Sequence, residues 1–199
     1  MNIFKSFAIF LIVAFLLAGC RGEKKEIPEV VPEPKTSEEP QPAPEPEPTP
    51  APEPTPIGRA QTQILDWADN RIHNIRLAVG QINGYTLAPG QGFSFNQVVG
   101  PRTADRGYKT ATVLLHGEKT QDYGGGVCQV STTLFQAARA AGLSVTERHS
   151  HQKDVGYAHP GDDAAVDYGN KDMCFTNNTS QTVTLEATVG NGVVSVSIR

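Results

Sequence analysis

The chain has little of what would place it in several common protein classes. Residues 57–199 hold twelve acidic and twelve basic residues, so they lack the positive surplus typical of a nucleic-acid-binding domain. No internal repeat is visible, and the one long apolar run, residues 7–18, is too short for a typical membrane-spanning helix. We therefore expect no nucleic-acid partner, and a single domain over 57–199, which is long enough for one core.

The apolar run instead suits a secretory signal. Lys5 precedes it, and it ends in Leu17-Ala18-Gly19-Cys20, which resembles a bacterial lipobox. The pattern predicts cleavage before Cys20 and acylation of its thiol, and more than one lipid chain makes membrane anchoring stable. The alternative is an uncleaved signal anchor that happens to contain a cysteine. We expect an extracytoplasmic, membrane-anchored lipoprotein of a bacterium, with residues 1–20 as its signal peptide.

Residues 21–56 have almost nothing apolar to bury. Twelve of the fifteen prolines lie between Pro28 and Pro56, and from Pro40 onward proline occupies every second position. Such a segment cannot form regular hydrogen bonds and stays solvated and extended. At about 3.1 Å per residue it could reach on the order of 100 Å. We expect a disordered Pro/Glu-rich stalk that is not part of the fold.

The rest of the chain mixes helical and strand patterns. Apolar residues recur at steps of three and four in two segments, and alternate with polar ones in others. The expected elements are an amphipathic helix within 58–80, turns and short strands over 86–102, a buried strand over 110–117, a helix over about 128–141, a strand over 143–151, and a C-terminal hairpin around Gly190-Asn191-Gly192. The predicted class is α+β, a single compact domain with mostly antiparallel strands.

Residues 124–133, GGGVCQVSTT, place Cys128 in the first turn of the second helix. A thiol becomes a nucleophile as the thiolate, which the N-terminal end of a helix stabilises. Three preceding glycines let a substrate approach closely and leave amide groups bare for an oxyanion. The pattern therefore favours a cysteine nucleophile. The alternative is a small buried cysteine that fills a gap in the core.

A cysteine nucleophile needs a base, and the candidates are five histidines: His73, His116, His149, His151 and His159. His149 and His151 are two apart on an expected strand and would share one face. Two other hypotheses use the same residues. Cys174 is the only other cysteine of the domain and could form a disulfide with Cys128. Alternatively, Cys128, His149, His151 and His159 could bind zinc, although their spacing matches no short metal motif.

Several motifs resemble the VanW family. They are NIRLAVGQINGYTLAPGQGFSFNQVVGPRTADRGY, GGGVCQVSTTLFQAARAAGLSVTERHSH, GDDAAVDYG and FTNNT, in that order. The resemblance runs from about Arg71 to about Thr182, and its GGGVCQVSTTLF core is highly specific. VanW-like proteins are bacterial, extracytoplasmic and associated with the cell wall, and the founding member belongs to glycopeptide-resistance gene clusters. Some have been assigned as peptidoglycan transpeptidases of the L,D type, acting through the cysteine of this motif.

The resemblance implies a reaction and a set of residues. Cys128 would attack a peptidoglycan stem peptide, release the terminal D-alanine and form a thioester, which an amine of a neighbouring stem would resolve. His151 would be the base and Asp163 the residue that orients it. The residues that would border the substrate and the oxyanion are Gly125, Gly126, Gln129 and His149. The expected partners are stem peptides and, through Cys20, the membrane; we expect no cofactor and no resident metal.

The chain also departs from the family pattern. Ala165 lacks the hydroxyl of the family's usual DATV segment, and HSHQKDV lacks the Ser and Pro that often follow the second histidine. Cys174 stands where the family more often has an apolar residue. Two functions therefore remain in view: a cysteine L,D-transpeptidase, or a hydrolase that uses the same thioester, and a non-catalytic lipoprotein module that binds wall peptides.

Overall fold

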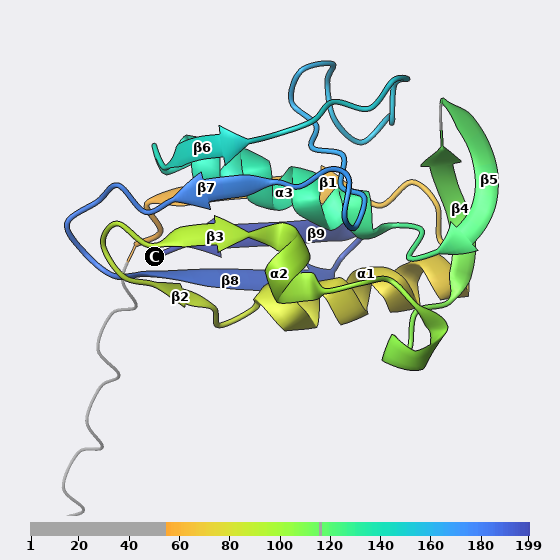
Figure 1. Ribbon diagram of the computed structural model, residues 1–199, viewed down its shortest axis with the longest axis horizontal. Helices are drawn as coiled ribbons and strands as arrows, with labels where there is room; N and C mark the ends of the chain where they lie inside the picture. The colour runs from red at the N-terminus through yellow and green to blue at the C-terminus, as the bar shows by residue number, and fades with distance from the viewer. Residues whose placement is uncertain (1–54, 116) are drawn as a thin grey trace, which may run out of the picture. The chain divides into compact units, whose positions relative to one another are not determined.

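The computed structural model describes residues 55–115 and 117–199, and the expected signal peptide and most of the stalk lie outside them. The strands form three antiparallel groups (Figure 1). The main sheet has the order β1-β9-β8-β2 and consists of β1 (Gly58–Gln63), β9 (Val193–Ile198), β8 (Val183–Gly190) and β2 (Thr86–Leu87). A second sheet has the order β3-β7-β6 and consists of β3 (Gly92–Ser94), β7 (Cys174–Thr176) and β6 (Ser144–Glu147).

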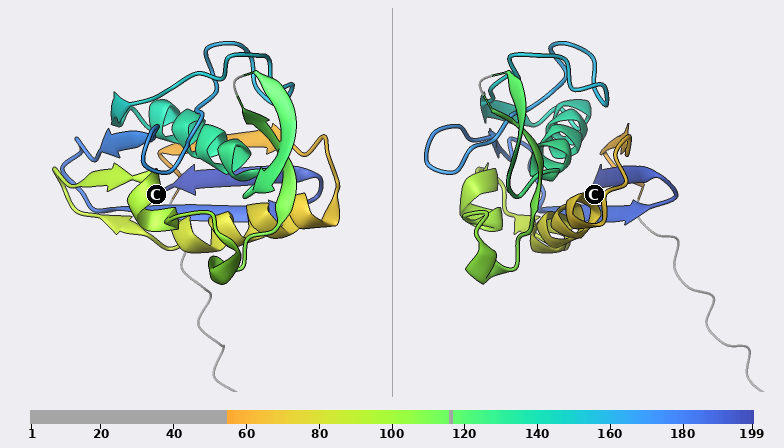
Figure 2. Two further views of the ribbon diagram at one scale, coloured as in Figure 1. Left: turned by 45° about the vertical axis from the view of Figure 1, so that its right-hand side comes forward. Right: turned by 90° about the vertical axis from the view of Figure 1, so that its right-hand side faces the viewer.

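Two long helices build the core with these sheets. Helix α1 (Asp69–Ile82) packs on β8, while α3 (Val127–Ala140) packs on β1 and β9 and also contacts β6 (Figure 2). Because α3 has neighbours on several sides, polar residues as well as apolar ones are buried along it. Gly58 shows how close the packing is, since a Cβ there would lie 2.5 Å from the carbonyl oxygen of Ala137.

Both ends of α3 are fixed by glycines. Gly126 precedes it with φ of 107°, and Gly142 follows its C-cap with φ of 70°, values that L side chains rarely adopt. At the C-terminal end the amide of Gly142 donates to Arg139 O and that of Leu143 to Ala138 O, the paired bonds of a Schellman motif. The expected helix over 128–141 is therefore confirmed to within one residue at each end.

The remaining elements lie between α1 and α3 in the chain. They are α2 (Phe95–Val99), a short 3-10 helix η1 (Ala104–Arg106), and the hairpin of β4 (Thr110–Leu115) with β5 (Glu118–Tyr123). The expectation of turns and short strands over 86–102 missed α2, which Ser94 caps by accepting a hydrogen bond from the Gln97 amide. The strand expected over 110–117 exists but is only partly buried, because it pairs with β5 alone.

The expected helix within 58–80 is wrong at its beginning. Residues 58–63 form β1, which pairs with β9 from Gly58↔Ile198 to Gln63↔Val193, and the helix starts only at Asp69. Spacing of apolar residues could not separate these two elements, since Ile64 and Leu65, just after β1, continue the steps of three and four that lead into the helix. Pairing with the distant C-terminal strand decides the conformation of 58–63.

The strand expected over 143–151 ends at Glu147, after an irregular register between Val145 and Glu147. His149 and His151 therefore lie beyond the strand and do not share a strand face. In contrast, the C-terminal hairpin is confirmed: Gly190 pairs with Val193 around the turn residues Asn191 and Gly192, both with positive φ. The α+β class and the antiparallel pairing are likewise confirmed.

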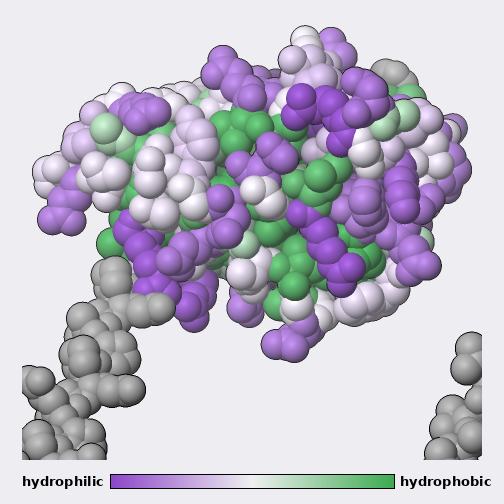
Figure 3. Space-filling model, turned by 90° about the horizontal axis from the view of Figure 1, so that it is seen from below, coloured by the Kyte–Doolittle hydropathy of each residue, from purple (hydrophilic) through white to green (hydrophobic). Residues whose placement is uncertain are grey.

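Seen from below, hydrophobic and hydrophilic side chains are mixed on the surface of the domain (Figure 3). Helix α1 is amphipathic: Ile72, Ile75 and Val79 are buried in the core, whereas Arg76 is exposed at the surface. Within residues 55–115 and 117–199, no helix is long and apolar enough to cross a membrane.

Candidate active site

Cys128 is the second residue of α3 and is half-buried. Its thiol donates to the carbonyl oxygen of Val166 at 3.4 Å. It also interacts with the imidazole of His151, both as a hydrogen-bonding partner and through charge. The long connection between β6 and β7 thus supplies two groups that act directly on the sulfur.

His151 and Asp163 lie at the two ends of a loop in this connection and meet through three atoms. Nδ1 of His151 lies 2.6 Å from Oδ2 of Asp163, and the backbone amide of His151 donates to the same oxygen at 2.6 Å. Both side chains are only 7% exposed. A carboxylate bound to Nδ1 fixes the ring orientation and leaves Nε2 to face a reacting group. The structure therefore brings Cys128, His151 and Asp163 together in the order that their predicted roles require.

Arg148 holds Asp163 from the other side. Its Nε donates to the Asp163 carbonyl oxygen at 2.6 Å and its Nη2 to Oδ1 at 2.8 Å. Burial alone would raise the pKa of Asp163, but the hydrogen bonds from His151 and the charges of His151 and Arg148 hold it below its usual range. Asp163 is therefore ionised near neutral pH and can stabilise a charged imidazole.

The pKa values of the thiol and the imidazole shift in opposite directions. Burial would raise the pKa of Cys128, but the hydrogen bond and the charge of His151, with a smaller effect from the charge of Arg102, bring it below its ordinary value. Burial would lower the pKa of His151, but Cys128 and then Asp163 raise it. These directions favour a thiolate–imidazolium pair, which titrates as a unit.

Helix α3 itself positions the loop that carries Asp163. Thr132 and Gln136 follow Cys128 at intervals of four residues and so lie on the same helix face. Thr132 Oγ1 accepts a hydrogen bond from the Ala164 amide at 3.0 Å, and Gln136 Nε2 donates to the Asp162 carbonyl oxygen at 2.9 Å. Residues on either side of Asp163 are thus fixed to the helix that carries the nucleophile candidate.

The glycines before Cys128 are explained by packing. A Cβ on Gly125 would lie 2.6 Å from the carbonyl oxygen of Thr112 in β4, and one on Gly126 would lie 2.8 Å from Ile75 in α1. The buried amide of Asn74 adds hydrogen bonds from its Nδ2 to the Gly125 carbonyl oxygen at 3.1 Å and to that of Lys109 at 2.8 Å. The glycines therefore let three elements meet behind the cysteine, and their expected role beside a substrate stays a prediction.

Two of the expected substrate-bordering residues point elsewhere. Gln129 is fully buried, and its Nε2 donates to Gln63 O at 2.8 Å and Thr62 Oγ1 at 3.1 Å in β1, while its backbone amide donates to Gly126 O. His149 pairs with the carboxylate of Glu147 at 2.9 Å. Gln129 is therefore a link between α3 and β1, and the His149 imidazole is partly exposed and pairs with the end of β6.

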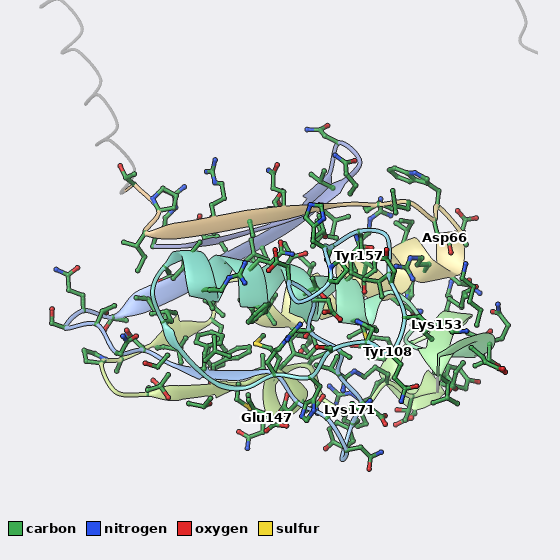
Figure 4. The ribbon with its side chains drawn as sticks, turned by 90° about the horizontal axis from the view of Figure 1, so that it is seen from above. Asp66, Tyr108, Glu147, Lys153, Tyr157 and Lys171 are labelled. Atoms are coloured by element: carbon green, nitrogen blue, oxygen red, sulfur yellow. The ribbon has the colours of Figure 1, made fainter. Side chains whose placement is uncertain are left out.

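The sequence did not single out Tyr157, which belongs to the loop between His151 and Asp163. Its ring meets the His151 ring edge-on at 6.5 Å, and its hydroxyl bonds with Thr132. Burial, followed by the charge of Cys128, raises its pKa, so the hydroxyl stays protonated. Figure 4 shows Tyr157 and Lys153 on this loop, near the end of α3 where Cys128 lies. A tyrosine in the HSHQKDVGYAH motif was the available signal.

The same loop encloses a hollow of about 290 Å³ beside the imidazole. His151 and Asp163 contribute to its wall, together with residues 150–155 and 158–161. The imidazole is thus bordered by the sulfur and by a space that a small group could enter from the loop side.

The two alternative hypotheses for Cys128 receive no support. Cys128 and Cys174 are both free, so the suggested disulfide is absent from the domain. In the part of the chain that the structure describes, no three His, Cys, Asp or Glu residues are arranged to hold a metal ion, and the ring of His151 is turned to Asp163 and Cys128.

Comparison with known proteins agrees with the motif resemblance. The family described as VanW like protein matches residues 70–199. Over 129 residues, 65% of this chain, it is 42% identical to Uncharacterized protein YoaR of Bacillus subtilis (strain 168), and over 62% of this chain it is 30% identical to Vancomycin B-type resistance protein VanW of Enterococcus faecalis (strain ATCC 700802 / V583).

The matched region spans 43% of the Bacillus protein and 46% of the Enterococcus protein, less than half the length of each. No solved structure matches the chain significantly. The family match covers most of the described domain, including Cys128, His151 and Asp163. The chain therefore belongs to the VanW family.

Proposed function

We propose that this domain is a cysteine acyltransferase that acts on peptidoglycan stem peptides in the manner of an L,D-transpeptidase. One observation carries the proposal: a thiol with a lowered pKa faces an imidazole with a raised pKa, and a buried, ionised carboxylate holds that imidazole. A binding module needs no thiolate, whereas acyl transfer does. Membership of the VanW family supports the stem peptide as the substrate class.

The reaction starts from the thiolate–imidazolium pair. The sulfur of Cys128 attacks the peptide carbonyl, a bond forms between sulfur and carbon, and the carbon–nitrogen bond breaks as His151 gives its proton to the leaving amine. A thioester and a neutral imidazole result. The acceptor amine then attacks the thioester and passes its proton to His151, which restores the pair; with water as the acceptor, the same steps give hydrolysis.

The oxyanion of this reaction needs hydrogen-bond donors that are not already used. The backbone amide of Gln129 already donates to Gly126 O, and that of Val127 already donates to Gly124 O. The amide of Cys128 itself makes no hydrogen bond within the described chain and lies at the N-terminal end of α3, where the helix dipole also favours negative charge. We assign this amide as the principal oxyanion donor.

The test is intact-protein mass spectrometry after incubation with a stem tetrapeptide. We expect release of the terminal D-alanine and a thioester adduct on Cys128. His151→Ala and His149→Ala form a matched pair, because both histidines lie near carboxylates but only His151 acts on the sulfur. Loss of the adduct is expected in His151→Ala alone. Tight binding of the peptide with no adduct in the wild-type protein would instead favour a non-catalytic wall-binding module.

We further propose that the domain works outside the cytoplasm, anchored through acylated Cys20 and extended on the 21–56 stalk. The lipobox-like sequence and the proline pattern support this. Cys20→Ala is expected to release the domain from membranes or to leave an uncleaved precursor. Normal processing and unchanged membrane association of this variant would refute the lipoprotein assignment.

A further inference from the structure

The loop between α2 and η1 carries an arginine that the reaction above does not use. Arg102 is half-buried, and its Nη1 donates to Asn96 Oδ1 at 2.7 Å and to Gly100 O at 3.1 Å. Its guanidinium lies 5.5 Å from the centre of the Phe95 ring. Nη2 is buried and has no hydrogen-bond partner in the described part of the chain, where Arg102 also makes no ion pair.

A guanidinium held this way is costly to a folded protein. Its hydrogen bonds go to neutral oxygens, and although the charges of Cys128, Asp172 and Asp167 act on it, no carboxylate among the described residues pairs with it directly. The nearby carboxylate of Asp172 is engaged otherwise, since it accepts hydrogen bonds from Ser94 Oγ at 2.5 Å and from the amide of Asn96 at 2.9 Å. Nη2 therefore has hydrogen bonds left to donate that no group of the described chain accepts.

Contacts connect this guanidinium to the reacting sulfur. Asn96, which binds Nη1, also donates to Asp167 O at 3.4 Å, and the preceding residue, Val166, accepts the Cys128 thiol. On the other side, the stem of Arg102 packs on Gly124, where a Cβ would lie 2.6 Å from Arg102 Cβ. Burial lowers the pKa of Arg102, and the charge of Cys128 is the largest effect that opposes this.

We propose that Arg102 binds the free C-terminal carboxylate of the acyl donor and so restricts the domain to the last peptide bond of a stem peptide. The inference rests on the proposed function and names a specificity-determining residue for it. Only one residue then follows the bond that is cleaved. From standard bond lengths, its carboxylate carbon lies about 3–4 Å from the carbonyl carbon that Cys128 attacks, so the group that binds it must lie in the surroundings of Cys128, whose charge acts on Arg102.

The chemistry of the guanidinium suits this role. It is planar and can offer two parallel N–H groups to a carboxylate, whereas a neutral amide end would leave the charge uncompensated. When the thiolate becomes a neutral thioester, the negative charge of the sulfur no longer acts on the guanidinium. The carboxylate of the donor supplies a negative charge to the guanidinium in its place during the acylation step.

The experiment compares two donors on the full-length protein: a stem tetrapeptide with a free terminal carboxylate and the same peptide with a terminal amide. The rate of adduct formation on Cys128 is measured as a function of donor concentration. We expect wild-type kcat/KM to favour the acid at least tenfold. In Arg102→Gln this ratio should fall at least tenfold, mainly through KM, and Arg102→Lys should lie between the two.

The ratio of two donors on one variant is insensitive to an inactive fraction, so partial unfolding of Arg102→Gln would not imitate the effect. Arg106→Gln is the matched control, because Arg106 lies four residues further along the chain, in η1, and donates to Val99 O at 3.2 Å; its donor ratio should stay at the wild-type value. Equal wild-type rates with both donors would overturn the inference. So would an equal loss with both donors in Arg102→Gln, since the charge would then serve only the thiolate or the oxyanion.

Binding separates this inference from the proposed function. Peptide affinity is measured for Cys128→Ala, with and without Arg102→Gln, and no chemistry is required. Tighter binding of the acid that depends on Arg102 supports the carboxylate site even if the wild-type protein forms no thioester, an outcome that would refute only the transferase. Equal affinity for acid and amide would refute the site.

Discussion

Cys128 and Cys174 are both half-buried and free, yet their surroundings differ in the sign of charge. Cys174 begins β7, and its thiol lies 3.8 Å from a carboxylate oxygen of Glu147. Burial first, and then the charges of Asp172 and Glu147, raise its pKa to about 12. Burial also acts to raise the pKa of Cys128, but His151 and Arg102 lower it. Figure 4 shows Glu147 well apart from Tyr157, which marks the Cys128 side.

The comparison shows that burial alone does not decide the direction in which the pKa of a thiol shifts. Both sulfurs are penalised by burial in the ionised form, but only one has cations to offset the penalty. Each 1.36 kcal/mol of differential interaction moves a pKa by about one unit. The neighbours of the sulfur, rather than its depth, therefore set the direction in which the pKa of each thiol shifts.

The largest expected difference lies between the two cysteine substitutions. Cys128→Ala should lower acyl transfer by about 10³-fold or more, because no other group can form the covalent intermediate. Cys174→Ala should leave the rate within about twofold, since its thiol is held protonated by its carboxylate neighbours. D-alanine release from a stem tetrapeptide is the measurement. Comparable losses in both variants would mean that the two sites are not functionally distinct.

Asp163→Asn should have the next largest effect. The amide cannot stabilise the imidazolium, and we expect a loss of about 10²–10⁴-fold, the range typical of general acid–base groups. The pKa of His151 should fall, so the high-pH limb of the rate profile moves to lower pH. Asp162→Asn is the matched control, because its pair with Arg139 at 2.8 Å lies at the solvent-exposed surface, where ion pairs contribute little to stability. A loss of the same size in the control would assign the effect to loop stability.

The pH dependence of alkylation should separate the two thiols. As pH rises, Cys128 should become reactive below the ordinary thiol pKa of about 8.5, whereas Cys174 should require strongly alkaline solution. Peptide mapping by mass spectrometry assigns the label to each residue. Since the raised pKa of His151 means that the imidazolium is lost only as pH rises through that value, His151→Gln should move the Cys128 midpoint upward. A midpoint of Cys128 above 9 would contradict the thiolate assignment.

The smallest effect is expected from Glu147→Gln. Removing one of the carboxylates that face Cys174 should lower the pKa of that thiol by about one unit or less, because burial and Asp172 remain. Alkylation of Cys174 is the measurement, and Cys128 in the same sample is the internal control. If the pH midpoint for alkylation of Cys128 moved by the same amount, the same charges would act on both thiols, and the contrast between their surroundings would be refuted.

The sequence determined the features that depend on neighbouring residues. Local apolar spacing and glycines predicted α3 to within one residue, and Asn191-Gly192 predicted the last hairpin. The family motif singled out Cys128, His151 and Asp163, which the fold brings together. Motif position, rather than periodicity, gave these three, since the expected strand at His151 does not extend beyond Glu147.

The tertiary structure alone decided the features that depend on distant contacts. Residues 58–63 are a strand because β9, more than a hundred residues later, pairs with them. Gln129 turns from the site because β1 supplies its hydrogen-bond partners, and Arg102 reaches the sulfur's surroundings because Gly124 lets its stem approach. The local sequence determines which side chains are present. The direction in which each side chain points, and the charges that surround it, are decided by packing between remote segments, because both depend on atoms that are adjacent only in space.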